Sequence, residues 1–233
     1  VPHPMRFDSR RPEPLVPRAL VREVRGRIGP DGAEFEALDE VDVMEAAQAL
    51  QDAGIEIAVV ALIHSYCNPA HEQQVREIVT RQGLSLRLEL SSEIWPQARE
   101  YERSVLTALN ASIRPIVETY LDRLTAGLAE RGLGLPPRVA RSNGGAELAV
   151  TLRERPVVAL LSGPAAGVAG AAATAEDAEW VSADLMTLDV GGTSADIGVI
   201  RGGRPVLSSE EQVGDFPVLV PTMARAESAA FLR

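Results

Sequence analysis

The chain has 233 residues, of which 45% are hydrophobic and only 4% aromatic, so it can bury a core made mostly of Ala, Val, Leu and Ile. A formal net charge of −10 disfavours nucleic acid and anionic membrane surfaces as partners. One cysteine excludes an intrachain disulfide, and there is neither a signal-peptide pattern nor an apolar run that could span a bilayer. We therefore expect a cytoplasmic protein of one large or two small domains.

The first region, residues 1–38, is expected to be an extended arm followed by a hairpin. Five prolines within residues 1–17 prevent a regular helix there. Apolar and charged residues alternate over 20–28, and Pro30-Asp31-Gly32 is typical of a turn. Residues 22–38 therefore resemble a hairpin.

The second region, residues 39–135, has the pattern of an α/β segment. The expected order is a helix over 39–53, a strand over 55–63, a helix over 70–82, a strand over 84–90 and a long helix over 99–126. The first strand is almost continuously apolar, which is typical of a parallel strand buried on both faces. Pro115 predicts a kink or a break in the long helix. The charged residues 99–103 at its start are expected to form a salt-linked surface.

A polar loop follows the apolar strand, where ligands gather in open α/β sheets. His64, His71 and Glu72 are residue types that hold metals or act as a general base. Alternatively, Asn68-Pro69 begins the next helix and Glu72 favours its first turn. The pattern favours the second interpretation for His71 and Glu72, and it leaves His64 open as a metal ligand.

The third region, residues 136–233, contains three motifs. The first is a short strand that ends in Ser142-Asn143-Gly144-Gly145. This segment can be a simple turn, because Asn and Gly tolerate left-handed backbone angles, or a loop that binds a phosphate or a substrate. Both interpretations have about equal support.

The second motif, residues 162–173, consists almost entirely of small residues. Ser162 can cap a helix, and Pro164 suits a first helical turn. Glycine within a helix costs up to about 1 kcal/mol relative to alanine. Glycines within this helix therefore predict that another part of the backbone passes very close to it.

The third motif, residues 185–200, reads as a strand, a tight turn and a second strand. Gly191 and Gly192, with the hydroxyls of Thr193 and Ser194, can surround an anionic oxygen. Asp189 and Asp196 lie at the mouth of that turn and can hold Mg²⁺ beside a phosphate. A hairpin with solvated aspartates is the alternative, with about equal support from the pattern alone.

In combination, these motifs resemble the hydantoinase/oxoprolinase family, which includes the A subunit of ATP-dependent N-methylhydantoinase, 5-oxoprolinase and the acetone carboxylase β subunit. The resemblance rests on Leu161–Ala171 and Leu188–Asp196 and covers about residues 11–221. Shorter matches run in the same order: His64-Ser65-Tyr66, Asn68-Pro69, His71-Glu72, Ser92-Glu93, residues 99–103, Asn110, Arg114-Pro115 and Ser142-Asn143-Gly144-Gly145.

The resemblance implies an α/β fold like that of actin, Hsp70 and sugar kinases, with a ribonuclease H-like sheet and flanking helices. The third motif would be the second phosphate clasp of that fold, and its phosphate contacts would be Gly191, Gly192, Thr193 and Ser194. Asp189 and Asp196 would be the catalytic carboxylates that orient Mg²⁺ or water. ATP would activate the ring carbonyl of a cyclic amide, such as a hydantoin or 5-oxoproline, by phosphoryl transfer.

Two parts of the family's pattern are not found. The family begins with another strand-Asp-Gly-Gly-Thr turn, and no such turn lies in the first half of the chain. After a segment like residues 213–221 the family continues into a glycine-rich loop, whereas residues 222–233 contain no glycine. We therefore expect a central fragment of the A subunit, with an incomplete fold and nucleotide cleft and no turnover by itself.

Three functions follow from the resemblance. The leading one is part of an ATP-dependent hydrolase of cyclic amides. The alternatives are a subunit of an ATP-dependent acetone-type carboxylase and a non-catalytic module for nucleotide binding or assembly. A B-type partner subunit is implied, and the sequence identifies neither the ring substrate nor the oligomeric state.

Overall fold

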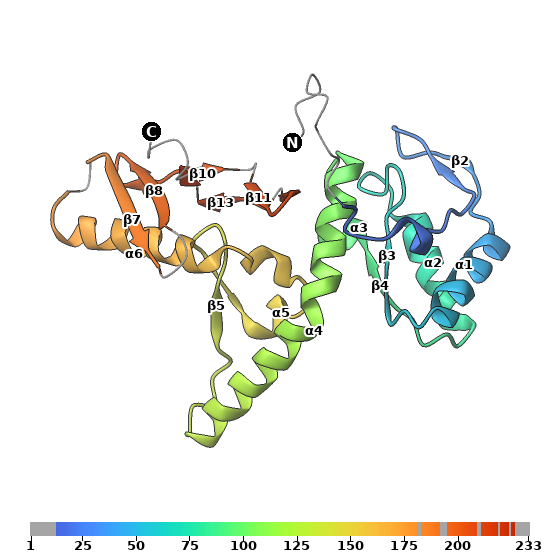
Figure 1. Cartoon of the computed structure of the whole chain (residues 1–233), viewed down its shortest axis with the longest axis horizontal. Helices are drawn as coiled ribbons and strands as arrows, with labels where there is room; N and C mark the ends of the chain where they lie inside the picture. The colour runs from blue at the N-terminus through green and yellow to red at the C-terminus, as the bar shows by residue number, and fades with distance from the viewer. Residues whose placement is uncertain are drawn as a thin grey trace. The chain divides into compact units, whose positions relative to one another are not determined.

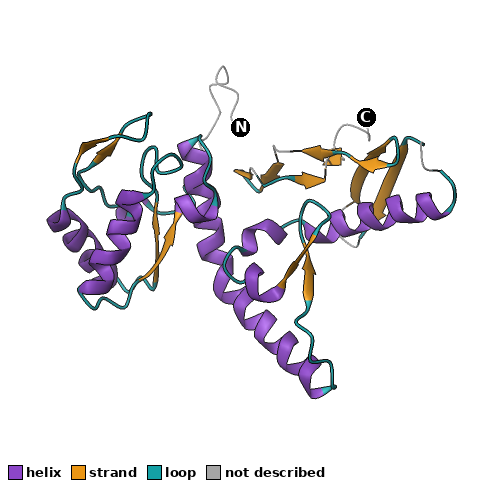
Figure 2. Cartoon of the chain, turned by 180° about the vertical axis from the view of Figure 1, so that it is seen from behind, coloured by secondary structure: helices purple, strands orange, loops and turns teal. Residues whose placement is uncertain are grey.

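A computed structural model of the protein describes residues 13–180, 183–191, 195–208, 211–218, 220–223 and 225–226. Helices and short strands are mixed along the chain (Figures 1 and 2). Contacts divide it into two compact units, residues 1–112 with 212–217 and residues 113–211 with 218–233. The sequence-based divisions after residues 38 and 135 stay predictions. Across the described ranges, every helix is too short or too polar to cross a membrane.

The first unit follows the predicted order of elements. They are η1 (Arg18–Leu20), β1 (Arg27–Ile28), β2 (Glu34–Glu36), α1 (Glu40–Asp52), β3 (Ile57–Val60), α2 (Ala70–Arg81), β4 (Arg87–Leu90), α3 (Ser91–Ile94) and the start of α4 (Glu100–Glu130). Strands β1 and β2 form the predicted hairpin. Most of the expected N-terminal arm lies outside the described residues. Helix α4 continues across Pro115 as one element, so the alternative of a broken helix is wrong.

Strands β3 and β4 are parallel neighbours, with Ile57 opposite Arg87 and Val60 opposite Leu90. Helix α2 connects them, which makes a β-α-β unit. Strand β3 is shorter than the apolar run over 55–63, because only four of its residues pair with β4. The loop that carries His64 therefore begins at the carboxyl end of this pair, as predicted.

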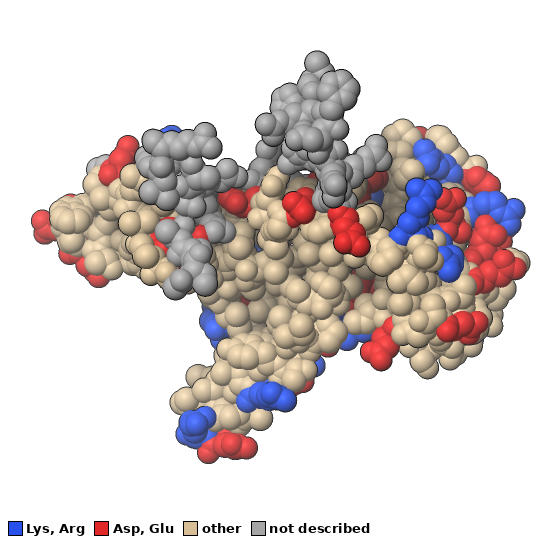
Figure 3. Space-filling view, viewed as in Figure 1, with Lys and Arg blue, Asp and Glu red and all other residues tan. Residues whose placement is uncertain are grey.

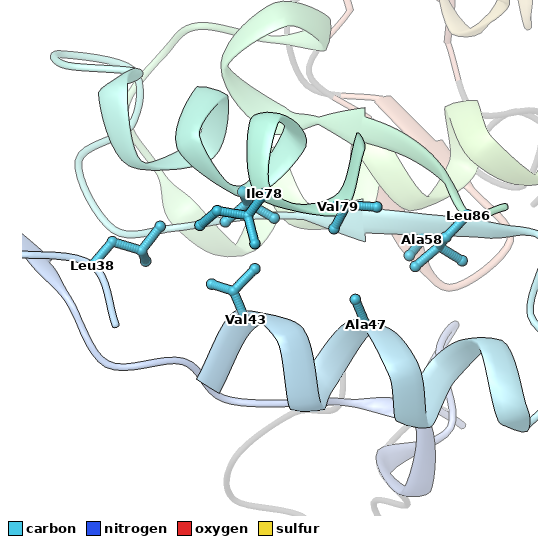
Figure 4. Packing of buried hydrophobic residues seen from close by; sticks show 8 residues of the cluster. Leu38, Val43, Ala47, Ala58, Ile78, Val79 and Leu86 are labelled. Atoms are coloured by element: carbon cyan, nitrogen blue, oxygen red, sulfur yellow. The ribbon is translucent and has the colours of Figure 1, made fainter. Parts of the chain in front are cut away.

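The core of the first unit lies between helices α1 and α2 and the β3–β4 strand pair. Val43 and Ala47 of α1 point toward Ile78 and Val79 of α2 (Figure 4). Ala58 of β3 belongs to the same cluster. Burying such side chains stabilises a fold by about 25 cal/mol for each Å² of apolar surface removed from water.

Ion pairs hold the N-terminal end of α1. Asp39 caps the helix, since its Oδ1 accepts hydrogen bonds from the backbone N–H groups of Val41 and Asp42. The Arg25 guanidinium donates from Nε to Asp42 Oδ2 at 2.7 Å, and this hydrogen bond lowers the pKa of Asp42 to about 2. On the face drawn in Figure 3, arginines likewise lie beside acidic side chains in this unit.

A network of buried polar side chains joins the loops at the carboxyl ends of β3 and β4. Glu72 is fully buried, and its carboxylate accepts hydrogen bonds from Leu62 N at 2.9 Å, Ser91 Oγ at 2.7 Å and Ser92 N at 2.9 Å. Arg103 donates from Nε to Ser91 Oγ at 3.0 Å. Ser91 therefore links the two opposite charges.

This network partly overturns the expectation of a salt-linked surface over 99–103. Arg99 and Glu102 do pair at 2.7 Å on the surface. Arg103, however, is 1% exposed and donates to the carbonyl oxygens of Leu62 and Gln97. A buried guanidinium needs this many acceptors to offset its lost hydration.

The second unit contains shorter elements. Its helices after α4 are α5 (Ala149–Leu152), η2 (Pro156–Ala159) and α6 (Ser162–Asp177), of which α6 confirms the predicted small-residue helix. The strands from here to the C-terminus are β5 (Arg138–Ala140), β6 (Ala146–Leu148), β7 (Leu185–Val190), β8 (Ala195–Arg201), β9 (Arg204–Pro205), β10 (Leu207–Ser208), β11 (Glu211–Val213), β12 (Phe216–Val218), β13 (Thr222–Met223) and β14 (Arg225–Ala226). Of these, residues 212–217 in β11 and β12 belong to the first unit.

The strands make small sheets. The largest has the order β14-β8-β7, and β9 also pairs with β8. Separate two-stranded pairs are β5-β6, β10-β13 and β11-β12. Helix α6 lies across β7 and β8 in both ribbon views (Figures 1 and 2) and shares a core with Ile200 and Met223. The chain is thus a mixed α/β protein with small sheets.

Removing the buried carboxylate tests the network of the first unit. We expect Glu72→Ala to lower the free energy of unfolding by roughly 3–5 kcal/mol, because it leaves three donors, Leu62 N, Ser91 Oγ and Ser92 N, without their acceptor. Glu77→Ala is the matched control, since Glu77 is an exposed residue of the same helix. Urea unfolding measures both, and equal losses for the two variants would contradict a structural role for Glu72.

Candidate functional site

The β7–β8 hairpin brings the two predicted carboxylates together. The strands are antiparallel, and Asp189 lies directly opposite Asp196, one pair from the turn. Residues opposite each other in an antiparallel pair project from the same face of the sheet. Asp189 is exposed and Asp196 is half-buried. Gly191 is exposed, whereas Gly192, Thr193 and Ser194 lie outside the described residues.

Helix α6 packs against this hairpin at a glycine of the strand. A Cβ atom added to Gly198 would lie 2.2 Å from Val168 Cγ2 and 2.5 Å from Thr187 Oγ1. Gly198 N also donates a hydrogen bond to that Thr187 oxygen at 3.1 Å. Val168 therefore reaches the strand only because position 198 has no side chain.

The expected close approach at the glycines of the helix is wrong. Among the described residues, and apart from its chain neighbours and the helix's own nearby backbone, a Cβ atom at Gly163, Gly167 or Gly170 would meet no heavy atom within 4 Å. The close approach is instead made through a glycine on the strand, where the side chain that fills the space comes from the helix.

A cleft of about 400 Å³ lies between α6, the turn end of the hairpin and β13, a size typical of small-molecule sites. Small and apolar residues of α6, such as Ala165 and Val168, form one wall. The polar side chains that line it are Thr187, Asp189, Asp196 and Thr222. No arginine, lysine or histidine is among the residues that line it, all of which are described.

The second glycine turn, residues 142–145, connects segments that surround the cleft. Ser142 is buried, and its hydroxyl donates to Val158 O at 2.9 Å and accepts from Leu161 N at 3.2 Å. Its carbonyl oxygen accepts from Met223 N at 3.0 Å. Ser142 thereby ties the start of α6 to β13.

The other residues of this turn have the geometry of a structural turn. Asn143 Oδ1 accepts from Gly145 N at 3.0 Å, and Gly144 has a φ of 78°. A Cβ atom at Gly144 would lie 2.0 Å from Met223 Cε. None of residues 142–145 lines the cleft, so direct contact between this turn and a ligand stays a prediction.

His64 lies in the first unit and has an unusual backbone. Its φ of 60° is in the left-handed region, and its Nδ1 lies 2.8 Å from the carbonyl oxygen of Ile28. A carbonyl oxygen can only accept, so Nδ1 carries a proton and Nε2 is left as the basic nitrogen. A histidine that binds a metal through Nε2 has this tautomer. Within the described ranges, however, no three His, Cys, Asp or Glu side chains gather to hold a metal.

His71 and Glu72 begin α2, which confirms the interpretation as a helix start. His71 is 3% exposed, and its Nε2 lies 2.7 Å from Glu34 Oε1 of the hairpin. Glu72 belongs to the buried network described above. Sequence reasoning missed Thr222, which lines the cleft, because nothing in its local pattern distinguishes it from other strand residues.

Comparisons with known proteins identify the class. Residues 103–231 match the hydantoinase/oxoprolinase family model, and residues 2–83 match the model of the hydantoinase/oxoprolinase N-terminal region. The chain belongs to the hydantoinase/oxoprolinase family.

Relatives with curated names support this assignment. The chain is 34% identical over 218 residues to the caprolactamase subunit alpha of Pseudomonas jessenii, which covers 93% of this chain and 31% of the relative. It is 32% identical over 166 residues to the 5-oxoprolinase of Saccharomyces cerevisiae, which covers 71% of this chain and 12% of the relative. The chain thus spans less than a third of the length of these relatives.

A solved structure agrees with the same assignment. The nucleotide-free structure of an acetone carboxylase superposes with a TM-score of 0.83 at 29% identity, and the match covers 94% of this chain and 31% of that chain. The arrangement of helices and small sheets described above is therefore that of a segment of this family.

Two glycine variants test the contact between α6 and the hairpin. We expect Gly198→Ala to lower the free energy of unfolding by roughly 1–3 kcal/mol, because the new methyl group overlaps Val168. Gly170→Ala should instead raise it by up to about 1 kcal/mol, because the helix has room there. Thermal or urea unfolding gives both values. A neutral Gly198→Ala variant would contradict the close packing.

Proposed function

We propose that this chain binds the phosphates of Mg·ATP in the cleft beside α6, as part of an ATP-dependent enzyme that opens cyclic amides. The observation that carries the proposal is the pairing of Asp189 with Asp196 at the turn end of the hairpin, where both line the cleft. The relatives named caprolactamase and 5-oxoprolinase support cyclic amides as the substrate class.

The residues of the cleft fit a nucleotide-bound Mg²⁺. Magnesium in nucleotide sites is commonly held by one or two protein carboxylates, and water and phosphate oxygens complete its shell. Asp189 and Asp196 supply two such carboxylates from neighbouring strands. Bound Mg²⁺ would neutralise phosphate charge. This matters here because the lining offers two negative side chains and no positive one.

We assign roles to these carboxylates from their positions and to the glycine turn from the family resemblance. Asp189 and Asp196 orient the cation and its water molecules, and Gly191, Gly192, Thr193 and Ser194 contact phosphate oxygens as the second clasp of an actin-like fold. The γ-phosphoryl group passes from ATP to the ring carbonyl oxygen, water adds to the activated carbon, and the ring C–N bond breaks. This cleavage leaves an acyl phosphate and a free amine, a second water hydrolyses the acyl phosphate, and ADP, phosphate and the ring-opened product leave. Positioning and charge stabilisation supply most of the catalysis in such transfers.

A specific observation favours a second function. The acetone carboxylase structure superposes on about the same share of this chain as the caprolactamase sequence aligns with. An acetone-type carboxylase subunit therefore uses the same frame. A third candidate is a module for nucleotide binding or assembly that does not turn over by itself. Relatives named as subunits support a B-type partner for this chain.

Calorimetric titration of the full chain tests the phosphate site. We expect Mg·ATP to bind weakly and Asp189→Asn to weaken binding by about tenfold or more, since the variant removes a charged ligand of the cation. ATP with EDTA should bind much less, because the carboxylates then repel the phosphates. Asp177→Asn, at the exposed end of α6, is the control with the same change in charge.

The outcome that would contradict the site is equal binding of Mg·ATP by the wild-type and Asp189→Asn chains. Release of ADP distinguishes the candidate reactions when a partner subunit is supplied. Hydantoin, 5-oxoproline and caprolactam test the hydrolase, and acetone with bicarbonate tests the carboxylase. Nucleotide binding without stimulated ADP release by any of these substrates would favour the binding module.

A further inference from the structure

Thr222 carries a buried hydroxyl without a hydrogen-bond partner. The side chain is 1% exposed, and its Oγ1 contacts no donor or acceptor within the part of the chain that the structure describes. Buried hydroxyl groups in folded proteins are nearly always paired, because an unpaired one loses its bonds to water without replacement. This exception therefore requires a physical explanation.

The position of Thr222 provides one. Thr222 lines the cleft together with Asp189 and Asp196. The carboxylates can only accept hydrogen bonds when ionised, and the Thr187 oxygen already accepts from Gly198 N. Among the side chains of the cleft, Thr222 is therefore the hydroxyl whose donor and acceptor capacity are both unused in the described chain.

The backbone holds Thr222 in place. It lies opposite Ser208 in the β10–β13 pair, and the next residue, Met223, donates its N–H to Ser142 O. Met223 also packs in the core shared with Val168 and Ile200. A side chain fixed by its neighbours in this way binds a ligand with little loss of conformational freedom.

We propose that Thr222 is a nucleotide-binding residue, whose hydroxyl donates a hydrogen bond to a phosphate oxygen of Mg·ATP in this cleft. The proposal rests on the phosphate site proposed above. It assigns to Thr222 the donor role that neither aspartate can fill. The bound phosphate in turn satisfies the hydroxyl that the ligand-free chain leaves unpaired.

Three variants of the full chain separate this role from a structural one. Thr222→Val keeps the shape and removes the hydroxyl, and Thr222→Ser keeps the hydroxyl and removes the methyl group. Thr174→Val is the control, because Thr174 donates to Gly170 O on the exposed side of α6 and does not line the cleft. Titration calorimetry with Mg·ATP gives the affinities, and thermal unfolding of the ligand-free chains gives the stabilities.

The expected result is a loss of affinity of about tenfold or more for Thr222→Val, a change of less than about threefold for Thr222→Ser, and none for Thr174→Val. The unfolding midpoint of ligand-free Thr222→Val should equal or exceed that of the wild type, because no hydrogen bond is lost.

Two results would overturn the role of Thr222. One is unchanged affinity of Thr222→Val under conditions where Asp189→Asn binds more weakly, which leaves the phosphate site intact without Thr222. The other is a lower unfolding midpoint or failure to fold, which shows that the hydroxyl has a structural partner. If the wild-type chain does not bind Mg·ATP, the phosphate site itself is wrong, and the inference falls with it.

Discussion

The contact between Val168 of α6 and the backbone of β8 at Gly198 is the constraint on which the site depends. A helix can approach a strand this closely only where the strand residue has no side chain, and a Cβ atom there would lie 2.2 Å from the valine. The contact places the small-residue face of α6 beside the end of the hairpin that carries Asp189 and Asp196. Ala165, Ile200 and Met223 belong to the same core as Val168, and Ala165 and Met223 also line the cleft, so the same packing shapes the core and the site.

Charge decides what such a cleft can bind. Its lining combines two carboxylates with hydroxyl and backbone groups, and the whole chain contains no lysine. An anion that enters without a cation is repelled by the two carboxylates, whereas a metal–nucleotide complex brings its own positive charge. The acidic composition of the chain, with a net charge of −10, acts in the same direction. The proposed metal-dependent binding would therefore follow from the side chains that are present.

Local patterns in the sequence predicted the elements that depend on local signals. The apolar run before Gly191 and the turn after it predicted the hairpin, and the small residues after Ser162 predicted α6. Arg103 was missed as a buried residue because its acceptors include Leu62 O, 41 residues away. The close contact was predicted at the glycines of α6, but it lies at Gly198 of β8. Only the packed structure shows which of two touching elements lacks a side chain. Thr222 was missed for the same reason, since burial and the lack of a partner are properties of the folded chain.

The most direct test of the account is to locate the metal on the protein in the presence of nucleotide. Mn²⁺ can replace Mg²⁺ at oxygen sites and broadens the NMR signals of nearby nuclei. In the full chain with ATP, we predict that broadening centres on the backbone amides of Asp189 and Asp196, and that it requires both the metal and the nucleotide. Broadening centred elsewhere, or a hairpin unaffected at saturating Mn·ATP, would contradict the account.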